Sequence, residues 1–539
     1  MEGENDPLLG SYKPKRRRSS LVYGLSRPQF LDTAASEVSP IPQERPTTSL
    51  RKPTPRVQRP ATDVSYGALE ETEENESIAS GLSVQEDFNS KAWWKELTLL
   101  IKFATPVVLT SLLQYGEVVT TVFSLGHLGK TELAAASLSN MTATITAFAI
   151  YQGIVSALDT VGTQSFGSGN YEMVGLHLQR ILAILLLIQF PIFLIWWKIE
   201  GILLFLRQDP LTCMFAAKYM RVMMLASPAY ALFEALKRFL QVQGIFHPVT
   251  YILAIVVPIN IFLNYLFVWS PWVGFGFLGA PVAVALTLWS ACAVLIIYIM
   301  KVNGRQAWGG FSREALKNWG PLCRLAVPGV IMICSEYWAF ELVTFASGVL
   351  GTTELASMSV LSTTSTLSYN LAFGVAAAAA TRVGNLIGAG NTKLAKLATH
   401  VSINLGAAIG VIIAVILFLT RNTWTYIFTS DKDVVALVAT IIPLVALINI
   451  ADNTQCVAGG LLRGQGRQRI GGVVNFIAYY LLGLPVAIIL CFKLDWGLYG
   501  LWIGIGAAIL IIAGVETWCS LHVNWDHLVE LANRQFDEA

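Results

Sequence analysis

The segment GVLGTTELA at residues 348–356 repeats GHLGKTELA at residues 126–134, which lies 222 positions earlier in the chain. Other segments recur at this spacing or at one residue less, and they pair LIKFATP (100–106) with LCRLAVP (322–328), LQVQG (240–244) with LRGQG (462–466), and FGSGN (166–170) with IGAGN (387–391). Self-similarity at one fixed period indicates an internal duplication. From residue 97 onward the chain therefore consists of two related halves.

The composition indicates a membrane protein. Of the 539 residues 54% are hydrophobic and 13% are charged, against about 25% charged residues in ordinary soluble domains. Apolar runs recur that are long enough, at about 1.5 Å per residue, to cross about 30 Å of hydrocarbon. We predict twelve spans, at residues 97–125, 132–158, 174–200, 211–236, 247–269, 276–301, 321–349, 354–381, 396–420, 434–460, 470–492 and 498–522. The expected fold class is an all-α multi-pass membrane protein, with twelve transmembrane helices in two parallel six-helix repeats, an N-lobe and a C-lobe, around a central cavity.

Six spans per half give both halves the same orientation, because an even number of crossings returns the chain to its starting side. Parallel repeats are typical of secondary transporters, which hold substrate and coupling ions near the bilayer midplane. Lys and Arg are about twice as frequent in the connections on the N-terminal side, which predicts a cytoplasmic N-terminus. The expected parts are a cytoplasmic N-terminal tail (1–90), the N-lobe with helices 1 to 6 (91–302), a cytoplasmic inter-lobe linker (303–320), the C-lobe with helices 7 to 12 (321–525) and a cytoplasmic C-terminal tail (526–539).

The N-terminal segment differs in kind from the rest of the chain. Residues 1–90 are rich in Pro, Ser, Glu and Arg and poor in aromatic residues, a composition that predicts disorder. Within it, ENDPLL resembles an acidic dileucine sorting signal, with Glu4, Leu8 and Leu9 as the expected contacts of a sorting adaptor. The basic stretch at 13–20 could attract anionic lipid or a basophilic kinase. The expected location is the vacuolar or the plasma membrane, and the sequence leaves that choice open.

Four carboxylates lie inside predicted spans. Glu336 is near the centre of the seventh span, Glu341 is five residues further outward, Asp452 has a similar depth in the tenth, and Glu117 lies in the outer half of the first. A charged carboxylate in the bilayer is costly, so it normally faces a cavity or a charged partner. The basic residues cluster at the inner ends of the spans, and we expect none at the depth of these acids. The four are therefore candidates for substrate and proton binding.

Further candidates surround these acids. In the repeat, the uncharged Gln114 corresponds to Glu336, so the two halves differ chemically. Aromatic faces near the acids could hold a flat or quaternary cation by cation–π attraction, and packing in the membrane explains them equally well. These aromatic residues are Tyr337, Trp338, Phe340 and Tyr369.

Two other acids invite a different interpretation. Asp159 falls at the cytoplasmic end of the second span and is expected to take part in an inner gate or loop network. Glu234 precedes Lys237 and Arg238 by three and four residues, a spacing that predicts an ion pair on one helix face.

Several long motifs, taken together and in this order, resemble one family. They are GHLGKTELAAASL (126–138), ALDTVGTQSFGSG (157–169), SEYWAFE (335–341), RVGNLIGAGN (382–391) and GGLLRGQGRQRIGGVVNFIAYYLLGLP (459–485). The chain is similar in them to eukaryotic multidrug and toxin extrusion (MATE) transporters, as a fungal or plant-like member, over residues 97–522.

The resemblance implies export of an organic cation, or of another xenobiotic or metabolite, in exchange for protons. It also implies that Glu336 and Glu341 are key acids of the seventh span, with Asp452 as an acidic position of the tenth. The chain departs from vertebrate members at Thr363, where they have a further glutamate. Either the proton route has fewer acids here, or Glu117 takes part of that role.

Other classes of function fit the sequence less well. A sodium-coupled antiporter of the same family is one alternative. A lipid-linked oligosaccharide flippase is another, but it would need several Arg or Lys in its cavity to hold a pyrophosphate. No CxxC, HExxH or glycine-rich phosphate loop occurs in the chain, and we expect no enzyme activity, cofactor, metal site or nucleic-acid partner. The expected partners are a small-molecule substrate, protons and the lipid bilayer.

Overall fold

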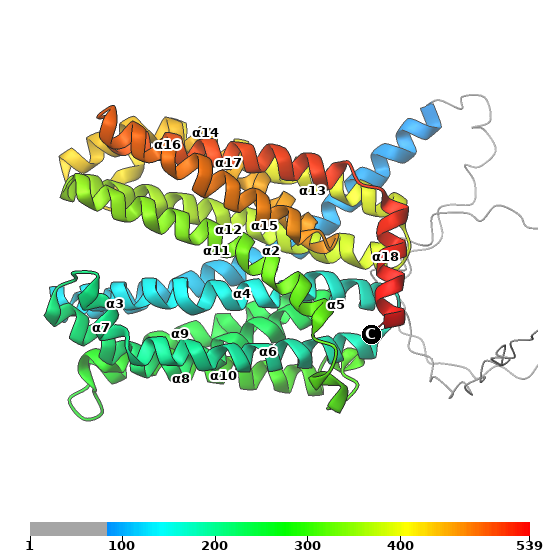
Figure 1. The fold of residues 1–539 in the computed structure, drawn as a ribbon, viewed down its shortest axis with the longest axis horizontal. Helices are drawn as coiled ribbons and strands as arrows, with labels where there is room; N and C mark the ends of the chain where they lie inside the picture. The colour runs from blue at the N-terminus through cyan, green and yellow to red at the C-terminus, as the bar shows by residue number, and fades with distance from the viewer. Residues whose placement is uncertain (1–82, 539) are drawn as a thin grey trace, which may run out of the picture. The chain divides into compact units, whose positions relative to one another are not determined.

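The computed structural model describes residues 83–538, and this part of the chain consists of helices and connecting turns without a β-strand (Figure 1). The expected sorting and phosphorylation segments lie outside the described residues. Eleven described helices are long and apolar enough to cross a membrane. A twelfth long helix, α8, has 33 residues but carries five charged side chains. The expected fold class is confirmed.

The N-lobe contains the first six spans. They are α2 (Ser83–Gly126), a broken second span of α3 (Lys130–Ala143), η1 (Thr144–Phe148), α4 (Ala149–Val155) and α5 (Leu158–Gly167), then α6 (Tyr171–Trp197), α8 (Pro210–Val242), α9 (His247–Trp269) and α10 (Gly279–Lys301). Short helices α7 (Ile199–Phe205) and η2 (Gly276–Leu278) lie in its connections, and η3 (Arg305–Ala307) and η4 (Arg313–Leu316) lie in the linker.

The C-lobe contains the other six spans. They are α11 (Gly320–Leu350), α12 (Thr352–Gly388), α13 (Thr392–Thr420), α14 (Lys432–Gly464), a broken eleventh span of α15 (Gln468–Phe476), η6 (Ile477–Gly483), α16 (Leu484–Ile488) and η7 (Ile489–Lys493), and α17 (Gly497–Leu521). Short η5 (Trp424–Ile427) precedes α14, and α18 (Trp525–Glu538) ends the described chain. We call the end of the bundle at which α2 begins and α17 ends the inner side; the charge bias predicts that it faces the cytoplasm.

Two terminal segments are more helical than the sequence suggested. Helix α2 begins at Ser83, so the expectation of disorder up to residue 90 is wrong for its last residues. The acidic residues of its sequence SVQEDF favour a helix start, because they complement the positive end of the helix dipole. The expected C-terminal tail forms α18, whose Leu528 and Ala532, one turn apart, are buried as the helix packs on α12 and α13.

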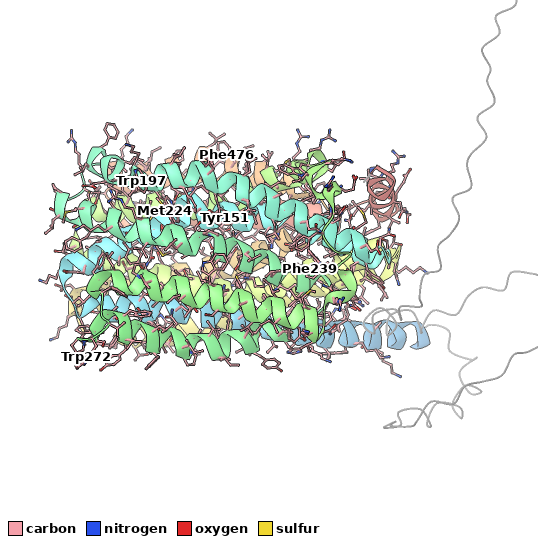
Figure 2. All side chains as sticks on the ribbon, turned by 90° about the horizontal axis from the view of Figure 1, so that it is seen from below. Tyr151, Trp197, Met224, Phe239, Trp272 and Phe476 are labelled. Atoms are coloured by element: carbon pink, nitrogen blue, oxygen red, sulfur yellow. The ribbon has the colours of Figure 1, made fainter. Side chains whose placement is uncertain are left out.

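Aromatic side chains mark the outer end of the bundle. Trp197 and Trp272 lie there and are 60% and 92% exposed, whereas Phe239 near the inner side is buried (Figure 2). Trp is enriched where a membrane meets water, because its ring is apolar and its N–H is polar. The exposed rings are consistent with an outer membrane interface at this level.

Close packing inside the C-lobe depends on small residues of α12 and α14. Gly460 and Gly464 are four residues apart on α14 and lie against the backbone of Ala376 and Ala380 on α12. A Cβ on either glycine would stand 2.5 Å from a carbonyl oxygen of α12, which real side chains do not tolerate. Small residues at this spacing let two membrane helices approach closely, so that dispersion forces can hold them together where lipid offers no hydrophobic drive. The same packing fixes the position of Arg463 between the two glycines.

The lobes meet along an inner seam in which α12 of the C-lobe packs on both α2 and α5 of the N-lobe. Gly384 and Gly388 of α12 face Thr163 and Gln164 of α5 so closely that a Cβ on either glycine would collide with them. Gly167 at the end of α5 lies against the backbone of α12 in the same way.

Polar contacts add to the inner seam. Gln164 Nε2 donates to the carbonyl of Gly464 at 3.3 Å, and Gln468 Nε2 donates to the carbonyl of Ser156 at 3.4 Å. A bidentate ion pair joins Arg382 of α12 to Glu96 of α2, at 2.7 and 3.0 Å. The described structure therefore has its lobes in contact on the inner side.

Gly388→Val is expected to open the inner seam, because the added side chain would meet the backbone of Gln164. The measurement is labelling of a cysteine at Ser156, in a variant without the seven native cysteines, by a membrane-impermeant maleimide applied from the inner side. Labelling should be faster by about fivefold or more. The matched control is Gly514→Val, since nothing lies within 4 Å of a Cβ at Gly514. Equal labelling of the two variants would contradict a tightly packed seam.

Candidate functional site: a central cavity and an acid pocket

A central cavity of about 380 Å³ lies between the lobes. N-lobe elements α2, α3, η1, α4, α8 and α10 and C-lobe helices α11, α12 and α14 supply its walls. The lining combines aromatic, amide and hydroxyl groups with two carboxylates, Glu117 in the outer half of α2 and Glu234 of α8. Its polar members are Ser111, Gln114, Tyr115, Glu117, Thr121, Asn140, Thr144, Gln152, Tyr219, Tyr230, Tyr337, Thr366, Tyr369 and Asn370.

Charged side chains form the base of the central cavity. Lys237 Nζ lies 2.6 Å from Glu234 Oε1, and both side chains are buried. Gln114 Nε2 donates to the same carboxylate oxygen at 3.4 Å. The expected pair of Glu234 with a basic residue on its own helix is therefore present, with Lys237 as the partner.

Asp159 joins the two lobes beneath this base. Its Oδ1 lies 3.3 Å from Arg238 NH1 of the N-lobe, and its Oδ2 accepts a hydrogen bond of 3.1 Å from Arg463 Nε of the C-lobe. All three side chains are less than one-tenth exposed. A buried carboxylate between two guanidinium groups is stable only while both stay close, because each charge replaces the water that the others have lost. The position of Asp159 agrees with its expected part in an inner gate.

A second, much smaller cavity lies inside the C-lobe. We call it the acid pocket, and it is lined by Met332, Ile333, Glu336, Tyr369, Gln455, Cys456, Gly459, Arg463, Asn475 and Glu516. Its volume of about 20 Å³ is enough for about one water molecule. Ile333, Tyr369 and Arg463 line both cavities, so they form the partition between the acid pocket and the central cavity.

One face of α14 supplies much of the acid pocket. Asp452, Gln455, Gly459 and Arg463 follow one another at intervals of three or four residues, which places them in one stripe of the helix. Asp452 does not line the pocket itself, but its Oδ1 accepts a hydrogen bond of 3.1 Å from Gln455 Nε2. The pocket is thus connected to a second carboxylate through one amide.

Three carboxylates from three helices act on one another here. Glu336 comes from α11, Asp452 from α14 and Glu516 from α17. Asp452 and Glu516 repel a negative charge on Glu336, and Arg463 attracts it. Asp452 and Glu516 are 4% and 1% exposed. All three carboxylates cannot carry an uncompensated charge in so dry a site, so a proton or another cation must accompany them.

The acid pocket also contains oxygens without a hydrogen-bond donor. Glu516 Oε1, Gln455 Oε1 and Asn475 Oδ1 are buried, line this pocket and have no partner among the described residues. Buried polar atoms are nearly always paired, so each such group needs an explanation. A donor such as a protonated carboxyl group or a water molecule would satisfy them.

The structure brings together most of the candidates from the sequence. Glu117, Gln114, Tyr337 and Tyr369 line the central cavity, and Glu336 lines the acid pocket, with Asp452 next to it. The remaining three candidates lie outside both linings and are considered next.

Glu341, Trp338 and Phe340 do not line either cavity. Trp338 Nε1 donates to the carbonyl of Ile145 across the lobes at 3.2 Å. Phe340 packs on the C-lobe core, with its ring 6.4 Å from that of Trp502. Their spacing on α11 explains the difference, because residues two, four and five positions after Glu336 cannot all share its helix face.

Two functional candidates were missed. Glu516 is the only charged residue of α17 and therefore gave a signal in the sequence, but its place near the end of the span concealed its depth. Arg463 lines the acid pocket with Glu336, so the expectation of no basic residue near these acids is wrong. Asp452 precedes Gly459 by seven residues, and Gly459 precedes Arg463 by four. This spacing places all three on one face of α14, so the sequence alone could have indicated that Arg463 lies near Asp452.

Comparison with known proteins decides the family. The MatE family model matches residues 106–266 and 328–489, once in each lobe. The chain belongs to the MatE family. It is a multi-pass membrane transporter and not an enzyme.

Relatives of this MatE protein occur in fungi, plants and animals. It is 44% identical to an uncharacterized transporter of Schizosaccharomyces pombe over 82% of its own length and 83% of the relative's. It is 35% identical to Protein DETOXIFICATION 16 of Arabidopsis thaliana, over 86% of this chain and 93% of that protein. It is also 35% identical to human Multidrug and toxin extrusion protein 1, over 80% and 76%.

A solved structure has the same architecture. The crystal structure of the eukaryotic MATE transporter AtDTX14 aligns with a TM-score of 0.79 and 30% identity, over 82% of this chain and 99% of that one. The family assignment therefore rests on sequence and structure together.

Phe340→Ala is expected to lower the thermal stability of this MatE protein and to leave the substrate affinity of the folded protein unchanged. The ring packs on the core with Trp502, and its removal should cost on the order of 2 kcal/mol. Thermal unfolding in detergent measures the effect, and Phe345→Ala, whose ring is 66% exposed on the same helix, is the control. A lost affinity with an unchanged unfolding temperature would place Phe340 in the binding site instead.

Proposed function

We propose that the protein exports organic cations or similar xenobiotics by proton-coupled antiport with alternating access. The single observation that supports this most is the meeting of Glu336, Asp452 and Glu516 beside the central cavity. Protonation of such a carboxylate and binding of a cation to it exclude one another. An antiporter needs this competition, because each ligand must displace the other.

The central cavity offers the features that a flat cation requires. Tyr337 and Tyr369 present aromatic faces, and Glu117 adds a carboxylate on the opposite lobe. Cations are attracted to aromatic faces, most strongly where water is excluded. Names such as Multidrug and toxin extrusion protein 1 among the relatives agree with a substrate of this class. In this proposal Tyr369, which lines both cavities, lets substrate and proton influence one another.

Alternation would consist of opening the inner seam while the outer side closes. The contacts of α5 with α12 would break, and the central cavity would become accessible from the inside. Binding free energy would shift the populations of the two states, and neither state needs to be fully occupied.

Sodium is a second candidate for the coupling ion. The unpartnered oxygens of Gln455, Asn475 and Glu516 favour it, because hard cations bind oxygen ligands. A flippase for a pyrophosphate-linked sugar is less favoured. Lys237, Arg238 and Arg463 do reach the base of the central cavity, but each has a carboxylate partner.

Glu336→Gln is expected to abolish transport driven by a pH gradient in proteoliposomes while the protein still folds. The amide resembles the protonated acid in size and hydrogen bonding, so it removes only the exchangeable proton. Glu336→Asp should retain partial activity, and Glu341→Gln should lose less than about tenfold, since Glu341 lies outside both linings.

The experiment needs a control and a test of the coupling ion. Glu354→Gln, at the outer start of α12 and outside both linings, should transport like the wild type. An imposed sodium gradient without a pH gradient should drive no transport. Wild-type rates and an unchanged pH profile in Glu336→Gln would refute the proposed proton site, and sodium-driven transport would select the second candidate.

A further inference from the structure

Arg463 occupies an unusual place, because it touches both the inner seam and the acid pocket. Its Nε donates to Asp159 of the other lobe at 3.1 Å. The same side chain lines the acid pocket together with Glu516. Opening of the inner seam would carry Asp159 away with α5, and Arg463 would then lose its described partner.

Glu516 is available as a replacement within the same lobe. It is 1% exposed, and its Oε1 has no hydrogen-bond partner among the described residues. A Cβ built on Gly459 would lie 3.3 Å from Glu516 Oε2 and 3.8 Å from Arg463 NH1. The two groups therefore lie on either side of the position beside Gly459, where the flexible side chain of Met332 now places its Cε.

A buried guanidinium that loses its carboxylate is strongly unfavourable, since neither water nor another charge replaces the lost partner. Glu516 is within reach of Arg463 if the flexible Met332 side chain moves out of the space beside Gly459. Arg238 and Asp159 both belong to the N-lobe, so this pair can stay together when the seam opens.

We propose that Arg463 exchanges its partner during transport, binding Asp159 while the inner seam is closed and Glu516 when the seam is open. This inference rests on the proposed function and extends it. It states that protonation of Glu516 favours the closed seam and that loss of this proton favours the open seam. With the seam closed, Glu516 lies among acids and keeps a proton. When the seam opens, the arriving Arg463 favours the ionised carboxylate, and the proton leaves toward the inner side.

The surroundings of Glu516 determine the direction of this effect. The charged or titratable groups that act on it from the packed helices are Glu336 of α11, Arg463 of α14 and Tyr479 of η6, and Asp452 of α14 acts on Glu336. Helix α15 contributes Gly471 against the carboxylate and Asn475 to the pocket lining, and its one charged residue, Arg469, is exposed and does not line the pocket. On α13, α16 and η7 the ionisable side chains, Lys393, Lys396, His400, Cys491 and Lys493, do not line the pocket. Arg463 is the cation of this group, so its arrival decides the charge of Glu516.

The test is the labelling of a cysteine at Ser156 by an impermeant maleimide from the inner side, measured from acidic to alkaline pH in the full-length protein. In the wild-type background, labelling should rise with pH by about fivefold or more, because loss of the proton from Glu516 stabilises the open seam. Glu516→Gln should remain poorly labelled at every pH, since Arg463 then has no charged partner in the open state.

A second variant keeps the test informative if Glu516→Gln does not fold. Gly459→Ala adds a methyl group that meets Met332 Cε, so Met332 can no longer move out from between Arg463 and Glu516, and no charge changes. It should therefore also flatten the pH dependence. Gly514→Ala, where nothing lies within 4 Å, is the matched control and should behave like the wild type.

The outcomes separate this inference from the proposed function. Glu336→Gln should lose proton-driven transport but still show labelling that rises with pH, because Arg463 and Glu516 are intact. The rise should move to lower pH, since one of the acids that oppose ionisation of Glu516 is gone. If Glu516→Gln or Gly459→Ala labels with the wild-type pH profile, the partner exchange is refuted even when transport is proton-driven. If labelling behaves as expected but no proton gradient drives transport, the exchange stands and the proposed coupling ion is refuted.

Discussion

The Asp159 carboxylate between Arg238 and Arg463 is the constraint on which the described arrangement depends. Two guanidinium groups from different lobes share one buried acid, and removal of Asp159 would leave two positive charges without a partner in a poorly solvated place. The pair therefore ties the closing of the inner seam to the base of the central cavity. It also holds Arg463 beside the acid pocket, so the acid pocket and the contact between the lobes share one side chain.

Glycine makes this arrangement possible. Gly460 and Gly464 bring α14 against α12, and Gly384 and Gly388 bring α12 against α5. Helix α12 thus serves both as the packing partner of α14 and as the C-lobe surface of the seam. Opening the seam would break the ion pairs between the lobes, Arg382 with Glu96 and Arg463 with Asp159.

The sequence was informative about this protein where a residue acts through its own helix. The duplication, the span count, the Glu234–Lys237 pair and the gate position of Asp159 all follow from spacing along the chain. It was less informative where depth depends on how another helix tilts or packs. Glu516 lies near the end of its span in the sequence, and this position concealed its depth. Phe340 was a candidate for the cavity because it lies close to Glu336 in the chain. Arg463 seemed to belong to an inner connection, although it lies within reach of the acid pocket.

By itself, the sequence determined the class of the protein, two parallel six-helix lobes in a membrane. It also placed acids at depths where a charge is costly and normally faces a cavity or a charged partner. Hydrophobic length and periodicity are local properties, so they can be read without knowing any contact. The tertiary structure alone decided which acids meet, because Glu336 and Asp452 lie 116 residues apart in the chain and Asp452 and Glu516 lie 64 residues apart. It alone showed that Arg463 lies near both Asp159 and Glu516, since that depends on how α14 packs against α5 and α17.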